Sequence, residues 1–188
     1  MKYCTLHANT PGGEVTMLNH EWGNVTWCDV SGGTDGWDPW GINNLTFEHN
    51  YIHDLTPYAG AHSDCIQPVT GAGPLSIRHN TLLSTNPSYP IGVYASGGSQ
   101  FPGNTSGMQI GQLTGNMATS GDFYFEDNLC DGGNYMFNAN WGSDGTHDLV
   151  GHIYIQNNRF GRDERYGLYT HVPGGHNIVL TGNVWDDN

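Results

Sequence analysis

The sequence predicts an all-β fold, a single-stranded right-handed parallel β-helix of roughly five to seven coils. Three observations predict it: a composition poor for helices, a strand-like pattern that recurs along the chain, and turn residues between the copies. The chain has 188 residues, a length that suits one domain, and 28 of them are glycine. Because glycine and asparagine disfavour helix interiors and favour tight turns, this composition suits many short strands.

Five segments repeat one pattern, in which apolar residues alternate with polar ones before an asparagine. They are LTFEHNYI (45–52), LSIRHNTL (75–82), FYFEDNLC (123–130), IYIQNNRF (153–160) and IVLTGNVW (178–185). A period of two signals a strand, and its return every ~25–30 residues is typical of a solenoid. We therefore expect the copies to stack as rungs. Their asparagines would then form a hydrogen-bonded ladder of Asn50, Asn80, Asn128, Asn158 and Asn183.

The spacing of the copies is uneven in one place. Asn80 and Asn128 are 48 residues apart, which fits either two coils or one coil with a large loop. Each coil needs a further strand, and turn-rich stretches precede the candidate segments. These candidates are residues 64–69, 108–112, 134–139 and 167–172. Right-handedness follows from the bias of parallel crossover connections.

The N-terminal part is expected to hold less regular coils, at residues 1–44. We assign it to the same single domain, residues 1–188, as part of a longer solenoid. Four cysteines lack a CxxC spacing, so a zinc knuckle is not predicted. Cys4 and Cys28 are 24 residues apart, close to one coil. Residues stacked ~4.8 Å apart are compatible with a disulfide, but free, buried thiols are the favoured prediction.

The charge of the chain restricts its partners. Lys and Arg total 5 against 18 acidic residues, and the formal net charge is −13. Such a chain repels phosphate backbones, so nucleic-acid binding is not expected. No apolar run approaches the ~18 residues that cross a bilayer, and no signal peptide is visible at Met1.

Several motifs resemble one family. HSDCIQ (62–67) resembles the His-Ser/Thr-Asp-Gly-Ile-Gln signature of pectate-lyase-like right-handed β-helix proteins, with Cys65 in place of glycine. MQIGQLTG (108–115) and FYFEDNLCDGGNYMF (123–137) resemble the later coils of the same proteins. NNRFGRDERYG (157–167) and GNVWDD (182–187) resemble the final coils of β-helix proteins from actinobacteria and from the minor tail proteins of their phages. The resemblance covers residues 45–188. It implies the fold more specifically than any activity, because the group mixes lyases, hydrolases, binding modules and virion parts.

Arg78 is the centre of the first catalytic hypothesis. A lyase that acts by β-elimination must neutralise a uronate carboxylate and abstract a proton. Arg78 would bind the carboxylate, with His79 or His53 as the base. A glycoside hydrolase instead needs two carboxylates, and Glu48 and Glu126 would lie about 10 Å apart, at the upper limit of inverting geometry. The alternative is a surface ladder of alternating charges, in which Arg78 lies between the two glutamates.

Two further groups are candidates for ligand binding. His62, Asp64 and Gln67 of the signature would bind a sugar or a metal, or else cap a turn. Tyr124 and Tyr154 occupy an outward column that suits sugar stacking, and packing under loops is the alternative for the aromatic residues in general.

Acidic, glycine-rich segments are candidates for Ca²⁺. Asp29, Asp35 and Asp38 lie in one such segment, residues 29–40, and residues 141–148 form another. The alternative for both is a solvated turn. The acidic pairs Asp163–Glu164 and Asp186–Asp187 are predicted as solvated turns.

The function predicted from these features is binding of a polysaccharide or cell-surface glycan, with lyase-type cleavage of an acidic polysaccharide as its enzymatic form. The scarcity of Lys and Arg argues against a uronate lyase unless Ca²⁺ substitutes. The alternative is a non-catalytic structural or receptor-binding part of a phage tail, which would form a homotrimer, or a surface adhesin. Both hypotheses predict an extracellular or virion-associated protein.

Overall fold

A computed structural model describes residues 1–9, 15–56, 64–67, 74–84, 106–110, 122–133, 135–139, 152–163, 167–170 and 177–186. All regular elements in these ranges are β-strands, and the strands pair in parallel, as predicted for an all-β fold. No helix in this part of the chain is long and apolar enough to cross a membrane.

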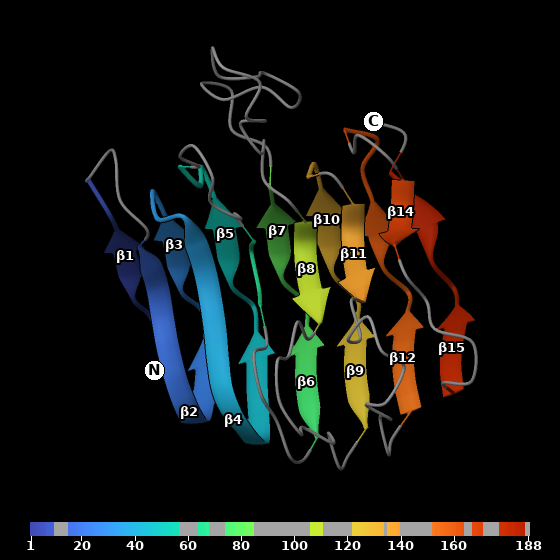
Figure 1. Ribbon diagram of the computed structural model, residues 1–188, viewed down its shortest axis with the longest axis horizontal. Helices are drawn as coiled ribbons and strands as arrows, with labels where there is room; N and C mark the ends of the chain where they lie inside the picture. Colours follow the sequence, from blue (N-terminus) through green and yellow to red (C-terminus); the bar gives the residue numbers. More distant parts are fainter. Residues whose placement is uncertain are drawn as a thin grey trace.

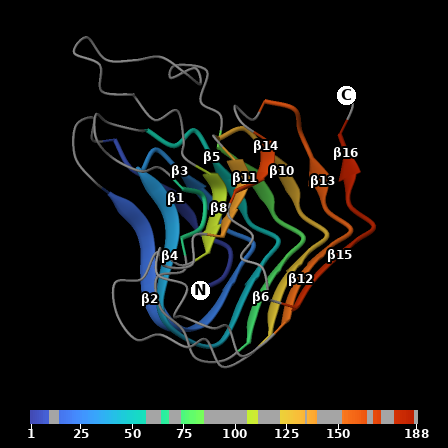
Figure 2. The same ribbon diagram turned by 45° about the vertical axis from the view of Figure 1, so that its right-hand side comes forward.

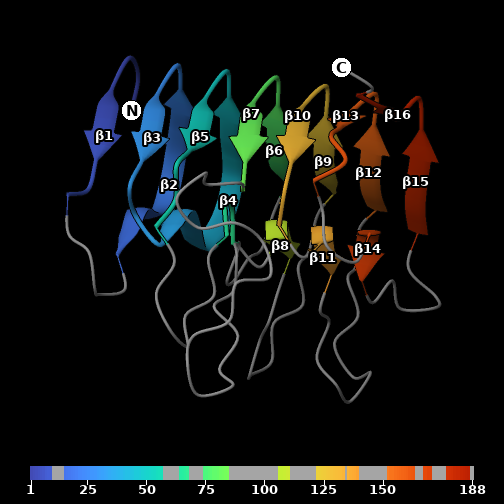
Figure 3. The ribbon, with the colours of Figure 1, turned by 90° about the horizontal axis from the view of Figure 1, so that it is seen from above.

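The described strands form three sheets (Figures 1 and 3). The six-stranded sheet has the order β15 (Asn177–Thr181), β12 (His152–Gln156), β9 (Phe123–Glu126), β6 (Leu75–Arg78), β4 (Asp35–Glu48) and β2 (Thr16–Thr26). The seven-stranded sheet has the order β1 (Thr5–His7), β3 (Asp29–Ser31), β5 (Tyr51–His53), β7 (Thr81–Leu83), β10 (Leu129–Asp131), β13 (Arg159–Phe160) and β16 (Val184–Trp185). The three-stranded sheet has the order β14 (Gly167–Thr170), β11 (Tyr135–Ala139) and β8 (Ser106–Ile110).

Each asparagine-centred copy contributes one strand to the six-stranded sheet and the next strand to the seven-stranded sheet. A two-residue corner joins them, for example His79 and Asn80 between β6 and β7. Figure 2 shows the chain turning at this corner from β12 to β13 and from β15 to β16. Sequence segments far apart therefore lie side by side as rungs.

The predicted interior column is confirmed. Strand register aligns Phe47 with Ile77, Ile77 with Phe125, and Phe125 with Ile155. The four side chains are at most 1% exposed. Because period-2 alternation sends these residues inward in every rung, stacking the rungs makes a continuous apolar core.

The long interval between Asn80 and Asn128 is one rung with a large insertion, because β6 pairs directly with β9 and β7 with β10. Three of the four predicted additional strands are confirmed as β8, β11 and β14. In the fourth candidate, the described residues 64–67 contain an isolated bridge from Ile66 to Trp37 instead of a strand.

In the N-terminal part, the acidic turn predicted for residues 29–40 is wrong in part, because residues 29–31 form β3 and residues 35–40 begin β4. The reason is packing. Trp37 is fully buried and stacks on Phe47, with ring centroids 4.4 Å apart. A Cβ at Gly36 would lie 2.5 Å from the Cys65 carbonyl oxygen, so this glycine permits a close approach of two backbones.

The predicted asparagine ladder is confirmed. The backbone N–H and the Nδ2 of Asn80 both donate to Asn128 Oδ1, at 3.0 Å each. Asn80 Nδ2 also donates to the Phe47 carbonyl oxygen at 2.9 Å. The same bonds recur from Asn50 to Asn183, and Cys28 occupies this position in the preceding rung, with its N–H 2.9 Å from Asn50 Oδ1.

The residue before each ladder position has a left-handed backbone, which turns the chain from one sheet to the next. The φ angles are Tyr3 55°, Trp27 59°, His49 56°, His79 55°, Asp127 56°, Asn157 55° and Gly182 67°. This conformation costs most L-residues about 1–2 kcal/mol, and glycine, asparagine and aspartate adopt it most readily.

The four cysteines are free, and two of them are expected to be unreactive. Burial raises the pKa of the Cys65 thiol to about 12 and that of Cys130 well above its usual value. Since the thiolate is the nucleophile, both should resist Ellman's reagent at about pH 8 in the folded protein, whereas half-buried Cys4 reacts. In denaturant all four should react. Rapid modification of Cys65 in the folded protein would contradict this burial.

Candidate functional site

The outer face of the six-stranded sheet gathers five of the residues predicted from the sequence. Glu48, Arg78 and Glu126 are successive register partners on β4, β6 and β9. Tyr124 lies two residues before Glu126, on the same face, and its register partner is Tyr154 on β12. These five residues are called the Arg–Tyr platform below.

The charge of Arg78 is matched within the platform. Its Nε lies 2.8 Å from Glu126 Oε2, and its guanidinium carbon lies 5.1 Å from the centre of the Tyr124 ring. Tyr124 stacks on Tyr154, with centroids 5.0 Å apart and ring planes 5° apart. The platform is therefore a half-buried surface of rings and paired charges. To bind a uronate, Arg78 would have to give up Glu126.

A hydrogen-bonded acid fixes one edge of the platform. The Tyr124 hydroxyl donates to Asp122 Oδ2 at 3.1 Å, and the His152 N–H donates to Asp122 Oδ1 at 2.9 Å. The His152 N–H lowers the pKa of Asp122, whereas burial, followed by the Asp122 carboxylate, raises the pKa of Tyr124. At neutral pH, therefore, the tyrosine remains a donor and the aspartate an acceptor.

The two histidines proposed as a base occupy different places. His79 follows Arg78 at the corner, is exposed, and stacks on His49 with centroids 5.0 Å apart. His53 ends β5 in the other sheet, where Nε2 lies 2.9 Å from Asp29 Oδ1 and Nδ1 lies 2.8 Å from Asp54 Oδ2. The structure thus places His79 in the corner, stacked on His49, and both ring nitrogens of His53 contact carboxylates of the other sheet.

The motif that resembles the family signature packs inward where it is described. Asp64 is fully buried, and its N–H donates to Asp35 Oδ1 at 2.9 Å. Gln67 is half-buried, and its N–H donates to the Trp37 carbonyl oxygen at 2.8 Å. His62 lies outside the described residues. In this arrangement the Asp64 carboxylate has no surface through which to contact a polymer.

The acidic residues proposed for Ca²⁺ point to separate partners. Asp29 contacts His53, Asp35 accepts from the Asp64 N–H, and Asp38 Oδ2 accepts from Thr16 Oγ1 at 3.0 Å. Over the described ranges, no group of three or more His, Cys, Asp or Glu side chains is arranged to hold a metal ion. The calcium hypothesis for Asp29, Asp35 and Asp38 therefore gains no support, and residues 141–148 lie outside the described part.

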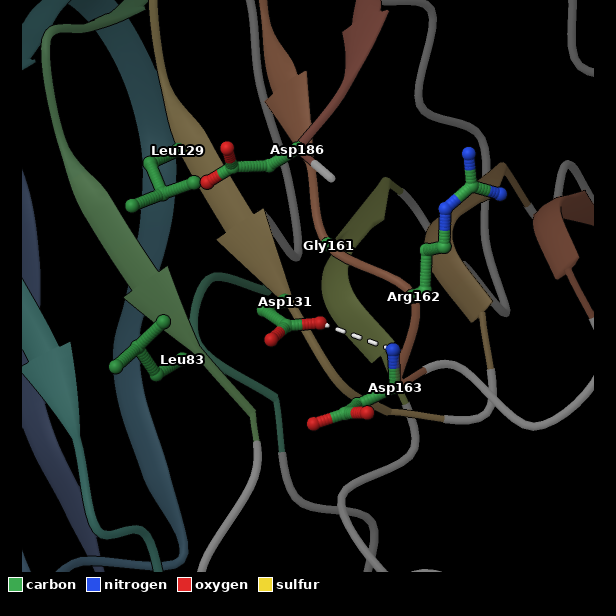
Figure 4. Close-up of a pocket in the computed structure, with 7 residues that line it drawn as sticks. All are labelled: Leu83, Leu129, Asp131, Gly161, Arg162, Asp163 and Asp186. Carbon is green, nitrogen blue, oxygen red and sulfur yellow. Dashed lines mark hydrogen bonds between the residues drawn. The ribbon is translucent and has the colours of Figure 1, made fainter. Parts of the chain in front are cut away.

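The structure also contains a cavity of about 390 Å³ that the sequence did not predict (Figure 4). It is lined by Leu83, Leu129, Asp131, Gly161, Arg162, Asp163 and Asp186. Asp131 Oδ1 accepts from the Asp163 N–H at 3.1 Å, and Asp186 Oδ1 lies 2.5 Å from Arg159 Nη2.

Asp186 thus forms an ion pair at the wall of the cavity, whereas the sequence suggested a solvated turn. The signal that was missed is positional. Asp131, Gly161 and Asp186 each lie three residues after a ladder asparagine, so they occupy the same position in successive rungs. A Cβ at Gly161 would clash with the Asp131 carboxylate, so the glycine leaves room for that side chain.

Comparisons with protein-family models, with curated proteins and with solved structures give no match. The resemblance to pectate-lyase-like proteins therefore stays a prediction.

Proposed function

We propose that this chain is a closed right-handed parallel β-helix that binds a neutral polysaccharide along its outer surface. Support for the closed solenoid comes from rungs that contribute parallel strands to successive sheets, with one interior column and one asparagine ladder. Right-handedness is expected from the strong bias of parallel crossovers.

The observation that carries the proposed function is the Arg–Tyr platform. Sugar sites combine ring surfaces with a few fixed polar groups, and the platform offers the Tyr124–Tyr154 stack beside Arg78 and Glu126. Arg78 is already paired with Glu126, and the chain has a formal net charge of −13. The platform therefore favours an uncharged sugar over a uronate.

Lyase-type cleavage of an acidic polysaccharide is the enzymatic alternative. It requires a cation for the carboxylate and a base near the same sugar, and His79, which follows Arg78 in the sequence, is the candidate for the base. The ultraviolet absorbance of an unsaturated product, measured on uronate polymers with and without EDTA, tests this alternative. A signal that disappears in Arg78→Ala would favour cleavage over binding alone.

A structural or receptor-binding role in a phage tail or adhesin is the second candidate. The support for it is the resemblance of residues 157–167 and 182–187 to the final coils of phage minor tail proteins. A trimeric mass by light scattering, together with no glycan binding, would support it.

A glycan array of neutral and uronate oligosaccharides tests the proposed function. We expect neutral oligosaccharides to bind, and Tyr154→Ala to weaken binding about 10-fold, because one ring contact is lost. Thr81→Ala, on the outer face of the other sheet, is the matched control and should bind normally. Equal affinity of Tyr154→Ala and the unchanged protein would remove the platform from the site. Absence of any bound glycan would overturn the function.

A further inference from the structure

We infer that four exposed rings at the corner between the two larger sheets form a second contact surface for a neutral polysaccharide chain running along the rung axis. This inference rests on the proposed function and extends it to residues outside the Arg–Tyr platform. The four residues, called the corner ring file, are Tyr3, Trp27, His49 and His79.

The corner ring file is continuous. Tyr3 and Trp27 have centroids 6.4 Å apart, Trp27 and His49 stack at 4.2 Å, and His49 and His79 stack at 5.0 Å. Tyr3 is 72% and Trp27 50% exposed, and both histidines are exposed. His79 directly follows Arg78 in the sequence, so the file ends at the corner that follows β6.

The backbone conformation at the corner restricts which residue types fit there at low cost, so the presence of aromatic rings calls for an explanation. All four have left-handed φ angles, which tyrosine and tryptophan rarely adopt and which histidine, like Asn and Asp, adopts more readily, so Tyr3 and Trp27 are the unusual residues. The chain itself shows the low-cost solution, because the same corner holds Asp127, Asn157 and Gly182 in later rungs.

Stacking explains why the rings of Trp27, His49 and His79 lie nearly parallel, but it does not explain why rings occupy a position that tolerates Asp, Asn and Gly elsewhere. Residues held in an unfavourable conformation at the surface point to a function for the side chain.

The chemistry of the file selects its occupant. The backbone at the corner is already bonded between rungs, for example from the Trp27 N–H to the Glu48 carbonyl oxygen and from the His49 N–H to the Arg78 carbonyl oxygen. A peptide therefore finds no free strand edge for pairing there.

Nucleic acid would need a basic groove beside the rings, and a formal net charge of −13 does not favour one. The rings of the file carry N–H and O–H groups as well as apolar faces, and both suit an uncharged sugar polymer.

Trp27→Asn is the decisive variant. Asparagine adopts the left-handed backbone conformation readily, so the substitution removes the ring and keeps the corner. The probe is the neutral oligosaccharide that gives the strongest signal on the array, titrated calorimetrically. We expect its Kd to rise about 10-fold or more, with an unchanged or higher Tm. His49→Asn should act in the same direction. Asp127→Asn, at the same corner without a ring, is the matched control and should leave Kd unchanged.

The outcomes separate the two proposals. Normal affinity in Trp27→Asn and His49→Asn, together with weak binding in Tyr154→Ala, would overturn the corner ring file and leave the platform in place. A lower Tm with normal affinity would assign the rings to stability and also overturn the inference. If the unchanged protein binds no glycan, the proposed function is wrong, and the corner ring file as a glycan surface is overturned with it.

Discussion

Replacing Asn128 with alanine is expected to lower the free energy of unfolding by about 3–5 kcal/mol. Its side chain donates to the Ile77 carbonyl oxygen and to Asn158 Oδ1, and it accepts from the N–H and the Nδ2 of Asn80. Asn128 is 1% exposed, so water cannot replace these bonds. Buried polar groups on two neighbouring rungs would lose partners at once.

Chemical denaturation measures this effect, and Asn183→Ala is the matched control. Asn183 ends the described ladder and is only half-buried, so solvent can replace part of what its side chain provides. We expect a loss of about 1–2 kcal/mol there. Equal losses at Asn128 and Asn183 would show that position in the ladder does not govern its strength.

Replacing Phe125 with alanine should cost about 3–5 kcal/mol, because it opens a cavity in the interior column. Phe125 is 1% exposed and lies in register between Ile77 and Ile155. The rungs on both sides are held by backbone and ladder bonds, so the neighbouring side chains have little freedom to fill the space.

Phe125→Leu is the matched control and should cost about 1–1.5 kcal/mol, since leucine keeps most of the apolar contact. Thermal and denaturant unfolding of the three proteins decide the point. A small loss for Phe125→Ala, equal to that for leucine, would mean that the column is loosely packed and that the stacked rungs are not its main constraint.

The residue pattern of one segment is enough to specify a rung. Alternation in each copy sent Phe47, Ile77 and Phe125 inward, and the asparagine that follows fixed the corner in each of the five copies. Both signals are local, because they depend on residues within one segment of about eight. Repetition then made the register between copies predictable, including Glu48, Arg78 and Glu126 as neighbours.

Tertiary structure decided the path between rungs and the groups that meet on the surface. Only the pairing of β6 with β9 showed that the long interval is an insertion, and only the burial of Trp37 turned an acidic segment into strand. His53 meets Asp29 across 24 residues, and the four corner rings come from four rungs.

The physical reason is distance along the chain. Side chains on neighbouring rungs lie about 4.8 Å apart although tens of residues separate them in sequence. A local pattern fixes where each side chain points within its rung. Which side chains of other rungs lie next to it depends on the path that the chain takes between the rungs.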